Sequence, residues 1–131
     1  MMEIEWNQEL VSGIDAIDLQ HRHIVSLLNE LTTAARSPHN YDLTHHFIEF
    51  NKAVQEHFSY EEALLNQCGF RELKRHKAGH EEIRELLDSM TTSIMLEDNA
   101  ISEDSLNQVV RWFKQHLLSE DTRFFAWQNN S

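Results

Sequence analysis

The sequence predicts an all-α fold, an antiparallel up-down-up-down four-helix bundle with an N-terminal arm and a short C-terminal tail. Apolar side chains recur at helical spacing in four long segments, and the short connections between them favour antiparallel neighbours. The 131 residues include only three glycines and one proline, too few for the frequent turns of a β-sandwich or barrel. We expect one domain, 1–131, with an arm at 1–16, the bundle at about 17–121 and a tail at 122–131.

The first half of the chain predicts the arm and two helices. Apolar anchors such as Ile4 and Trp6 are scattered along the arm, and Asp18 can cap a first helix at about 18–36. A polar break at 37–40 precedes a second helix at about 42–68, which Gly69 ends. The inward stripes comprise Ile17, His21, Ile24, Val25, Leu28 and Leu31 in the first helix, and Phe47, Phe50, Val54, His57, Glu61, Leu64 and Leu65 in the second.

The second half predicts two further helices. A third helix is expected at about 71–96, and Ser102 caps a fourth that frays after Asp121. The aromatic tail TRFFAWQNNS is expected to pack back on the bundle. The inward stripes comprise Leu73, His76, His80, Ile83, Leu87 and Ile94, followed by Leu106, Val109, Trp112, Phe113, His116 and Leu117.

Charge and composition exclude several partners. Eleven Lys and Arg against 22 Asp and Glu give a formal net charge of −11, which disfavours nucleic acid and anionic lipid. The single cysteine, Cys68, cannot form an internal disulfide, which fits a reducing compartment. The N-terminus does not resemble a signal peptide, and no segment approaches the roughly 20 apolar residues of a membrane span. We expect a cytoplasmic monomer that does not insert into membranes.

Histidine is unusually frequent, with nine residues, and five of them lie on the inward stripes of the four helices. Residues four apart share one helix face, so His76 pairs with His80, and His57 with Glu61. Buried imidazoles without partners cost about 1–3 kcal/mol each, and bound metal ions remove that cost. The five inward residues are His21, His57, His76, His80 and His116, whereas His23, His39, His45 and His46 are expected on the surface.

A second inward carboxylate comes from HLLSED at 116–121, as Glu120 or as Asp121. Glu120 follows His116 by four residues and fits a regular helix. Asp121 follows by five and requires a π-type bulge or local unwinding, which occurs at functional sites. Geometry alone slightly favours Glu120.

Four motifs follow one another in a fixed order over nearly the whole chain, after Trp6 and the SGID segment of the arm. They are IDLQH at 17–21, HFSYEE at 57–62, H-x-x-x-H at 76–80 and H-x-x-x-x-D at 116–121. Each motif alone is weak, but the ordered set is specific. It resembles the hemerythrins, in particular the small single-domain bacterial kind.

The resemblance implies a di-iron centre of two non-haem iron ions joined by an oxo or hydroxo bridge. It selects Asp121 rather than Glu120 as the second carboxylate. If both irons are six-coordinate, the implied ligands leave one position open, on the iron with only two histidines. The implied ligands are His76, His80 and His116 on one iron, His21 and His57 on the other, and Glu61 and Asp121 as bridges.

The same resemblance implies reversible dioxygen binding without catalysis, for oxygen storage, transport or delivery to an oxygen-consuming enzyme. Two alternatives stay open: an oxygen or redox sensor acting through a partner, and peroxide or nitric oxide chemistry at the same irons. The chain contains no Glu-x-x-His motif, which argues against the ferritin-like di-iron enzymes.

Two aromatic residues precede His116 on its own helix face. Trp112 and Phe113 either line the ligand pocket or belong to the core. Hemerythrins more often have leucine where Phe113 stands, so the bulkier ring is expected to alter ligand access if it lines the pocket.

Overall fold

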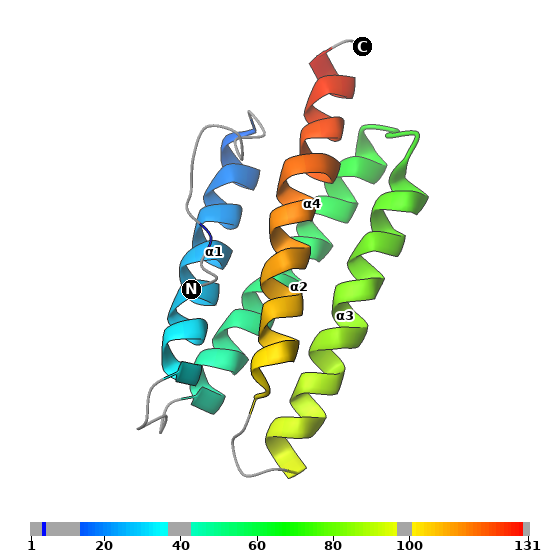
Figure 1. Ribbon diagram of the computed structural model, residues 1–131. Coiled ribbons are helices and arrows are strands. Elements are labelled where there is room, and N and C mark those ends of the chain that lie inside the picture. The colour runs from blue at the N-terminus through cyan, green and yellow to red at the C-terminus, as the bar shows by residue number, and fades with distance from the viewer. Residues whose placement is uncertain (1–3, 5–13, 37–42, 97–100, 130–131) are drawn as a thin grey trace.

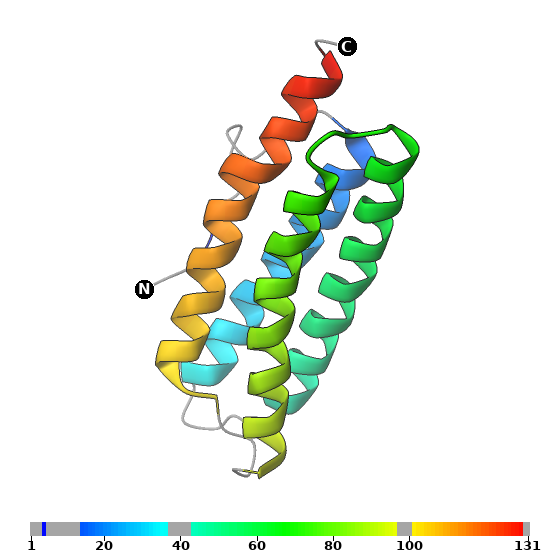
Figure 2. The same cartoon turned by 90° about the vertical axis from the view of Figure 1, so that its right-hand side faces the viewer.

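The computed structural model describes residues 4, 14–36, 43–96 and 101–129, with side chains described as far as residues 94 and 118 in the last two ranges. In this part of the chain the secondary structure consists of helices without strands. Successive helices run in opposite directions and form one bundle (Figure 1, Figure 2). The predicted all-α, up-down-up-down bundle is therefore confirmed. The helices are α1 (Asp15–Arg36), α2 (Leu43–Gln67), α3 (Leu73–Leu96) and α4 (Glu103–Asn129).

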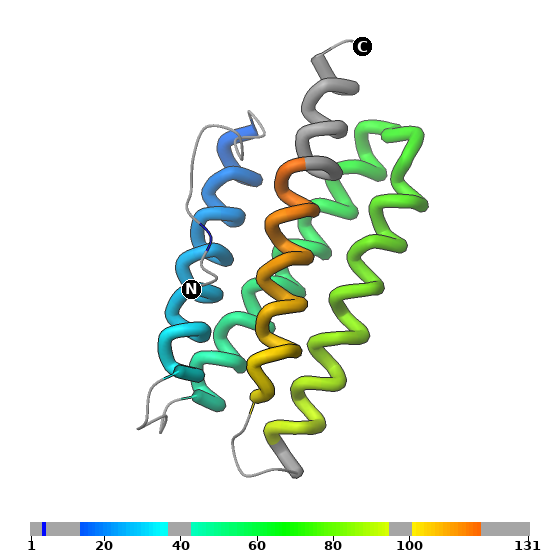
Figure 3. The backbone as a smooth tube through the Cα atoms, viewed as in Figure 1, coloured from blue at the N-terminus to red at the C-terminus, as the bar shows by residue number. Residues whose placement is uncertain are grey.

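Each helix packs against two others, so that the bundle closes. The packed pairs are α1 with α2, α2 with α3, α3 with α4, and α4 with α1, and the chain path is easily followed in Figure 3. Side chains from all four helices fill the space between them, because each helix has one apolar stripe. Leu28, Phe50, Leu87 and Val109 are fully buried examples, one from each helix.

Gly69 ends α2 as the sequence predicts. Its φ is 67°, a left-handed conformation that favours glycine. The amide of Gly69 donates to the carbonyl of Asn66 at 3.2 Å, and the amide of Phe70 donates to the carbonyl of Leu65 at 3.0 Å. This pair of hydrogen bonds is a Schellman motif, and the Phe70 and Leu65 side chains pack together as such motifs favour.

The start of α1 and the end of α4 differ most from the prediction. The first helix starts at Asp15, so Asp18 lies in its first turn and its amide already donates to the carbonyl of Ile14 at 2.9 Å. The fourth helix starts after Ser102, whose Oγ accepts from the amide of Ser105 at 3.1 Å, as predicted for a cap. It then continues to Asn129 rather than fraying after Asp121. The sequence beyond Asp121 contains no Gly or Pro to break it.

The arm is described at Ile4 and from residue 14 onward. Ile4 is buried, and its amide and carbonyl bond the Asn29 side chain of α1 at 3.1 and 2.9 Å. The predicted anchor Trp6 and the polar break at 37–40 lie outside the described residues. None of the helices described has the length and apolar character needed to cross a bilayer.

The buried histidines and Glu61 lie between two apolar clusters. A small cluster, Leu65 and Phe70 with three half-buried neighbours, lies at the α2–α3 turn. The main core fills the bundle away from that turn. The inward histidines occupy the level between the two clusters, near the starts of α1 and α3.

The glycine turn predicts opposite effects of two alanine substitutions. Gly69→Ala should lower the free energy of unfolding by about 1 kcal/mol, because a Cβ disfavours the left-handed conformation. Gly79→Ala is the matched control, since Gly79 lies inside α3. It should raise the free energy by about 0.5–1 kcal/mol through higher helix propensity. An added Cβ meets no atom within 4 Å at either position. Urea unfolding of the metal-free variants, followed by circular dichroism, measures both values, and equal signs would contradict this account of the turn.

Candidate metal centre

Six of the seven predicted ligands lie together in the interior of the bundle. Their side chains are at most 4% exposed, so neither bulk water nor surface counterions can satisfy them. Every helix contributes at least one, because each inward stripe carries a histidine at the same level. The six are His21, His57, Glu61, His76, His80 and His116.

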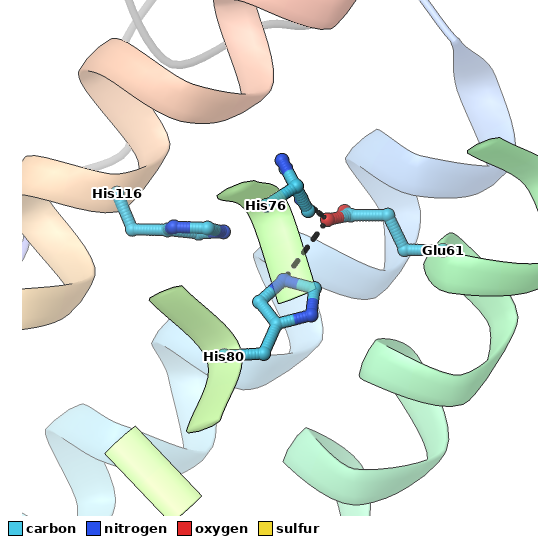
Figure 4. A group of neighbouring side chains, drawn as sticks. All are labelled: Glu61, His76, His80 and His116. Carbon is cyan, nitrogen blue, oxygen red and sulfur yellow. Dashed lines mark hydrogen bonds and ion pairs between the residues drawn. The ribbon is translucent and has the colours of Figure 1, made fainter. Parts of the chain in front are cut away.

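The Glu61 carboxylate is the centre of this cluster. Its Oε2 lies 3.0 Å from His57 Nε2 and 3.6 Å from His21 Nε2. Its Oε1 contacts His76 Nε2 and lies 3.2 Å from His80 Nε2. Figure 4 shows Glu61 reaching from α2 toward the two α3 histidines, with the ring of His116 approaching from α4. The two oxygens of one carboxylate therefore face two different pairs of imidazoles.

The potential ligand atoms form two groups that share this carboxylate. One group is Glu61 with His76, His80 and His116, and the other is Glu61 with His21 and His57. Within each group the potential ligand atoms lie within 4.8 Å of one another, which is close enough for all of them to bind one metal ion. The site is therefore divided into a three-histidine and a two-histidine position.

The outer nitrogens of two histidines fix how their rings are protonated. His80 Nδ1 lies 2.7 Å from Glu62 Oε2, and His57 Nδ1 lies 2.6 Å from Gln20 Oε1. Both oxygens are acceptors, so both Nδ1 atoms donate. In a neutral ring the Nε2 atom then carries a lone pair, which points into the cluster. This is the tautomer that a metal-binding histidine requires.

The charge states at the centre favour a cation. Burial alone would raise the pKa of Glu61, but the contacts with His21, His57, His76 and His80 outweigh burial and hold its pKa well below the ordinary value. Burial lowers the pKa of His80, although Glu61 and Glu62 oppose that effect. A buried carboxylate anion and an imidazole that burial keeps neutral thus lie 3.2 Å apart. Both are ligands that divalent metal ions accept, so the residues fit the implied metal site.

Aromatic rings cover the three-histidine side. Phe58 stacks on His80 with ring centroids 3.9 Å apart and planes within 10°. Trp112, which is half-buried, stacks on His116 at 4.4 Å and 13°. Phe113 is buried against Phe50 and Trp112, with ring centroids 5.7 and 4.9 Å away. Trp112 therefore contacts the cluster directly, whereas Phe113 packs beside it in the main core.

The second carboxylate lies beyond the described side chains. The backbone of α4 is α-helical through residues 116–121, so the bulge that geometry requires for Asp121 does not appear there. The side chains of Glu120 and Asp121 lie outside the described part.

The outer partners of the predicted ligands were not identified from the sequence. Gln20 directly precedes His21, and Glu62 directly follows Glu61, within the motifs at 17–21 and 57–62. Their position beside predicted ligands could have indicated this role. Arg84 lies one turn after His80, and its Nη2 atom is 3.2 Å from Glu62 Oε2. Nothing in the sequence around Arg84 indicated this contact.

The remaining histidines were expected on the surface. His23 and His45 are exposed, His46 is half-buried and His39 lies outside the described residues. The single cysteine, Cys68, is exposed.

The fold and the cluster together define a four-helix bundle with a buried histidine and glutamate site able to bind metal ions. Residues 12–127 match the hemerythrin HHE cation-binding domain. The chain belongs to this hemerythrin family.

Curated relatives and solved structures agree with this membership. A bacteriohemerythrin of Clostridium acetobutylicum is 29% identical over 124 residues, covering 91% of this chain and 96% of the relative. One of Stenotrophomonas maltophilia is 27% identical, covering 95% of this chain and 80% of the relative. A wild-type hemerythrin crystal structure has a TM-score of 0.87 at 19% identity, covering 94% of this chain and 95% of that one. A point mutant of hemerythrin gives 0.88 at 20% identity, covering 96% and 97%. The structural likeness bears on the fold alone.

Proposed function

We propose that the cluster holds two iron ions and that the loaded protein binds dioxygen reversibly. The observation that carries this proposal is the shared Glu61 carboxylate, whose oxygens face two separate groups of imidazoles. A carboxylate in this position suits a bridge between two cations. The proposed ligands are His76, His80 and His116 at one position, His21 and His57 at the other, and Glu61 and Asp121 between them.

The two-histidine position is the proposed site of dioxygen. It has one protein ligand fewer than the other position, so a small molecule has room there. Two ferrous ions in the site would supply the two electrons that a dioxygen molecule takes up on binding and returns on release. The nitrogen-rich ligand set has few anionic donors, which suits reversible binding better than oxygen activation.

The surrounding residues keep the proposed ligands away from bulk solvent. The six described ligands are at most 4% exposed, and Ile24 and Phe58 beside them are almost fully buried. Exclusion of water limits proton access and hence the irreversible oxidation of the metal. The chain's own contribution is therefore to hold neutral imidazoles in place and to exclude solvent.

The proposed role is non-enzymatic oxygen storage, transport or delivery to an oxygen-consuming enzyme. The curated relatives are called bacteriohemerythrins, and proteins of this type are generally oxygen binders. We place the protein in the cytoplasm as a monomer, in agreement with its single cysteine.

Oxygen cycling tests the proposal directly. The purified protein should contain about two iron ions per chain, as the two-position site requires. When the reduced protein is exposed to air and then purged with argon, a visible absorption band should appear and disappear over repeated cycles. One-way oxidation would contradict the carrier and favour a sensor, and steady turnover of peroxide or nitric oxide would favour an enzyme.

The choice of Asp121 over Glu120 predicts unequal effects of two alanine substitutions. Asp121→Ala should weaken iron binding by at least about tenfold, because loss of even an outer partner of a metal ligand costs this much. Glu120→Ala removes the same charge one residue away and should leave iron content unchanged. Iron analysis after dialysis against a chelator measures both, and equal losses would show that the bridge is wrongly assigned.

A further inference from the structure

His80 and His57, one histidine from each metal position, differ in the kind of group that holds the ring from outside. His80, of the three-histidine position, donates from Nδ1 to the carboxylate of Glu62 at 2.7 Å. His57, of the two-histidine position, donates from Nδ1 to the amide oxygen of Gln20 at 2.6 Å. One outer acceptor carries a negative charge and the other is neutral. Hydrogen bonds to a charged acceptor are roughly twice as strong as neutral ones.

Arg84 fixes the charged acceptor in place. Its Nη2 lies 3.2 Å from Glu62 Oε2, the same oxygen that accepts from His80. The guanidinium also bonds Glu81 at 2.5 Å and Gln55 at 3.1 Å. It lies over the ring of Phe58, 5.2 Å from the centroid, on the ring that stacks against His80. Since the Glu62 and Arg84 side chains are only 17% and 22% exposed, solvent screens this network weakly.

The outer contact of His57 is more open than that of His80, although His116 of the three-histidine position also lines a pocket, of about 360 Å³. Gln20 and His57 both line a pocket of about 410 Å³ between α1 and α2. The pocket also has polar walls, including Glu56 and Tyr60, and Tyr60 is 44% exposed. Solvent therefore approaches the Gln20 contact, whereas Phe58 and Arg84 cover the Glu62 contact.

These differences bear on how strongly each ring binds a cation. A carboxylate that accepts the Nδ1 proton raises the electron density of the imidazole and makes its Nε2 a better donor. A neutral amide does this less. We infer that Glu62, positioned by Arg84, strengthens metal binding at the three-histidine position, whereas Gln20 leaves the two-histidine position weaker, so that the positions fill in order. The inference rests on the proposed function, because it requires a site for two metal ions.

Glu62 and Gln20 are thus positioning residues that act through the ligand histidines. The three-histidine position would serve as the permanent anchor of the centre. The two-histidine position, which the proposed function assigns to dioxygen, would be the one that loads last and loses its metal first. Ligand number alone also predicts this order, so the test must change the outer groups and leave the ligands intact.

The experiment is a titration of the metal-free full-length protein with Co²⁺ under argon. Visible absorption and competition with a chelator give two stepwise dissociation constants. Glu62→Gln should raise the first dissociation constant by about 10–100-fold and leave the second dissociation constant nearly unchanged. Gln20→Glu should lower the second dissociation constant by a similar factor. Glu81→Gln is the matched control, because it removes a charge that contacts Arg84 but not His80. It should change neither constant.

The outcomes separate this inference from the proposed function. A wild-type chain that binds fewer than two cobalt ions overturns both. Two bound ions with the first constant changed equally by Glu62→Gln and Glu81→Gln overturn the inference alone, since only overall charge would then matter. If Glu62→Gln does not fold, Gln20→Glu decides: a tighter second constant supports the inference, and an unchanged one overturns it.

Discussion

The contact between the Glu61 carboxylate and the surrounding imidazoles is the interaction on which the structure depends. A carboxylate that is 3% exposed must be surrounded by groups that stabilise its charge. Those groups come from α1, α2 and α3, and the ring of His116 approaches from α4. The register of all four helices is therefore tied to one side chain. The bundle could not shift one helix by a turn without leaving this charge unmatched.

The apolar clusters on either side keep that register. The Schellman turn at Gly69 joins Leu65 to Phe70, and the following helix starts three residues later at Leu73. The length of this turn sets the level at which His76 meets Glu61 across the α2–α3 pair. The main core below the site anchors the other ends of the helices. The polar centre thus lies between two apolar clusters that hold the helices on either side of it.

The helices and the buried cluster of five histidines and Glu61 were predictable from the sequence, because both follow the helical period. An inward histidine such as His80 lies within an apolar stripe, so the sequence indicates both that the side chain is buried and that it can bind a metal ion. The outer partners do not lie on an apolar stripe. In the sequence, half-buried Glu62 and Arg84 therefore cannot be distinguished from the solvated charged residues of any helix. The end of α4 was misjudged because an aromatic tail looks like a separate segment, although nothing in its sequence breaks a helix. The choice of Asp121 over Glu120 comes from the family resemblance, because the regular helix at 116–121 favours Glu120, four residues after His116.

The shared carboxylate also shapes which mutations the protein can accept. Both oxygens of Glu61 are engaged, so any replacement there alters the two halves of the centre at once. Gln20 and Glu62 each touch one half only. Glutamine and glutamate have nearly the same shape, and a single nucleotide change exchanges them. Evolution can therefore adjust one half of the centre in small steps at these outer positions, while position 61 stays fixed.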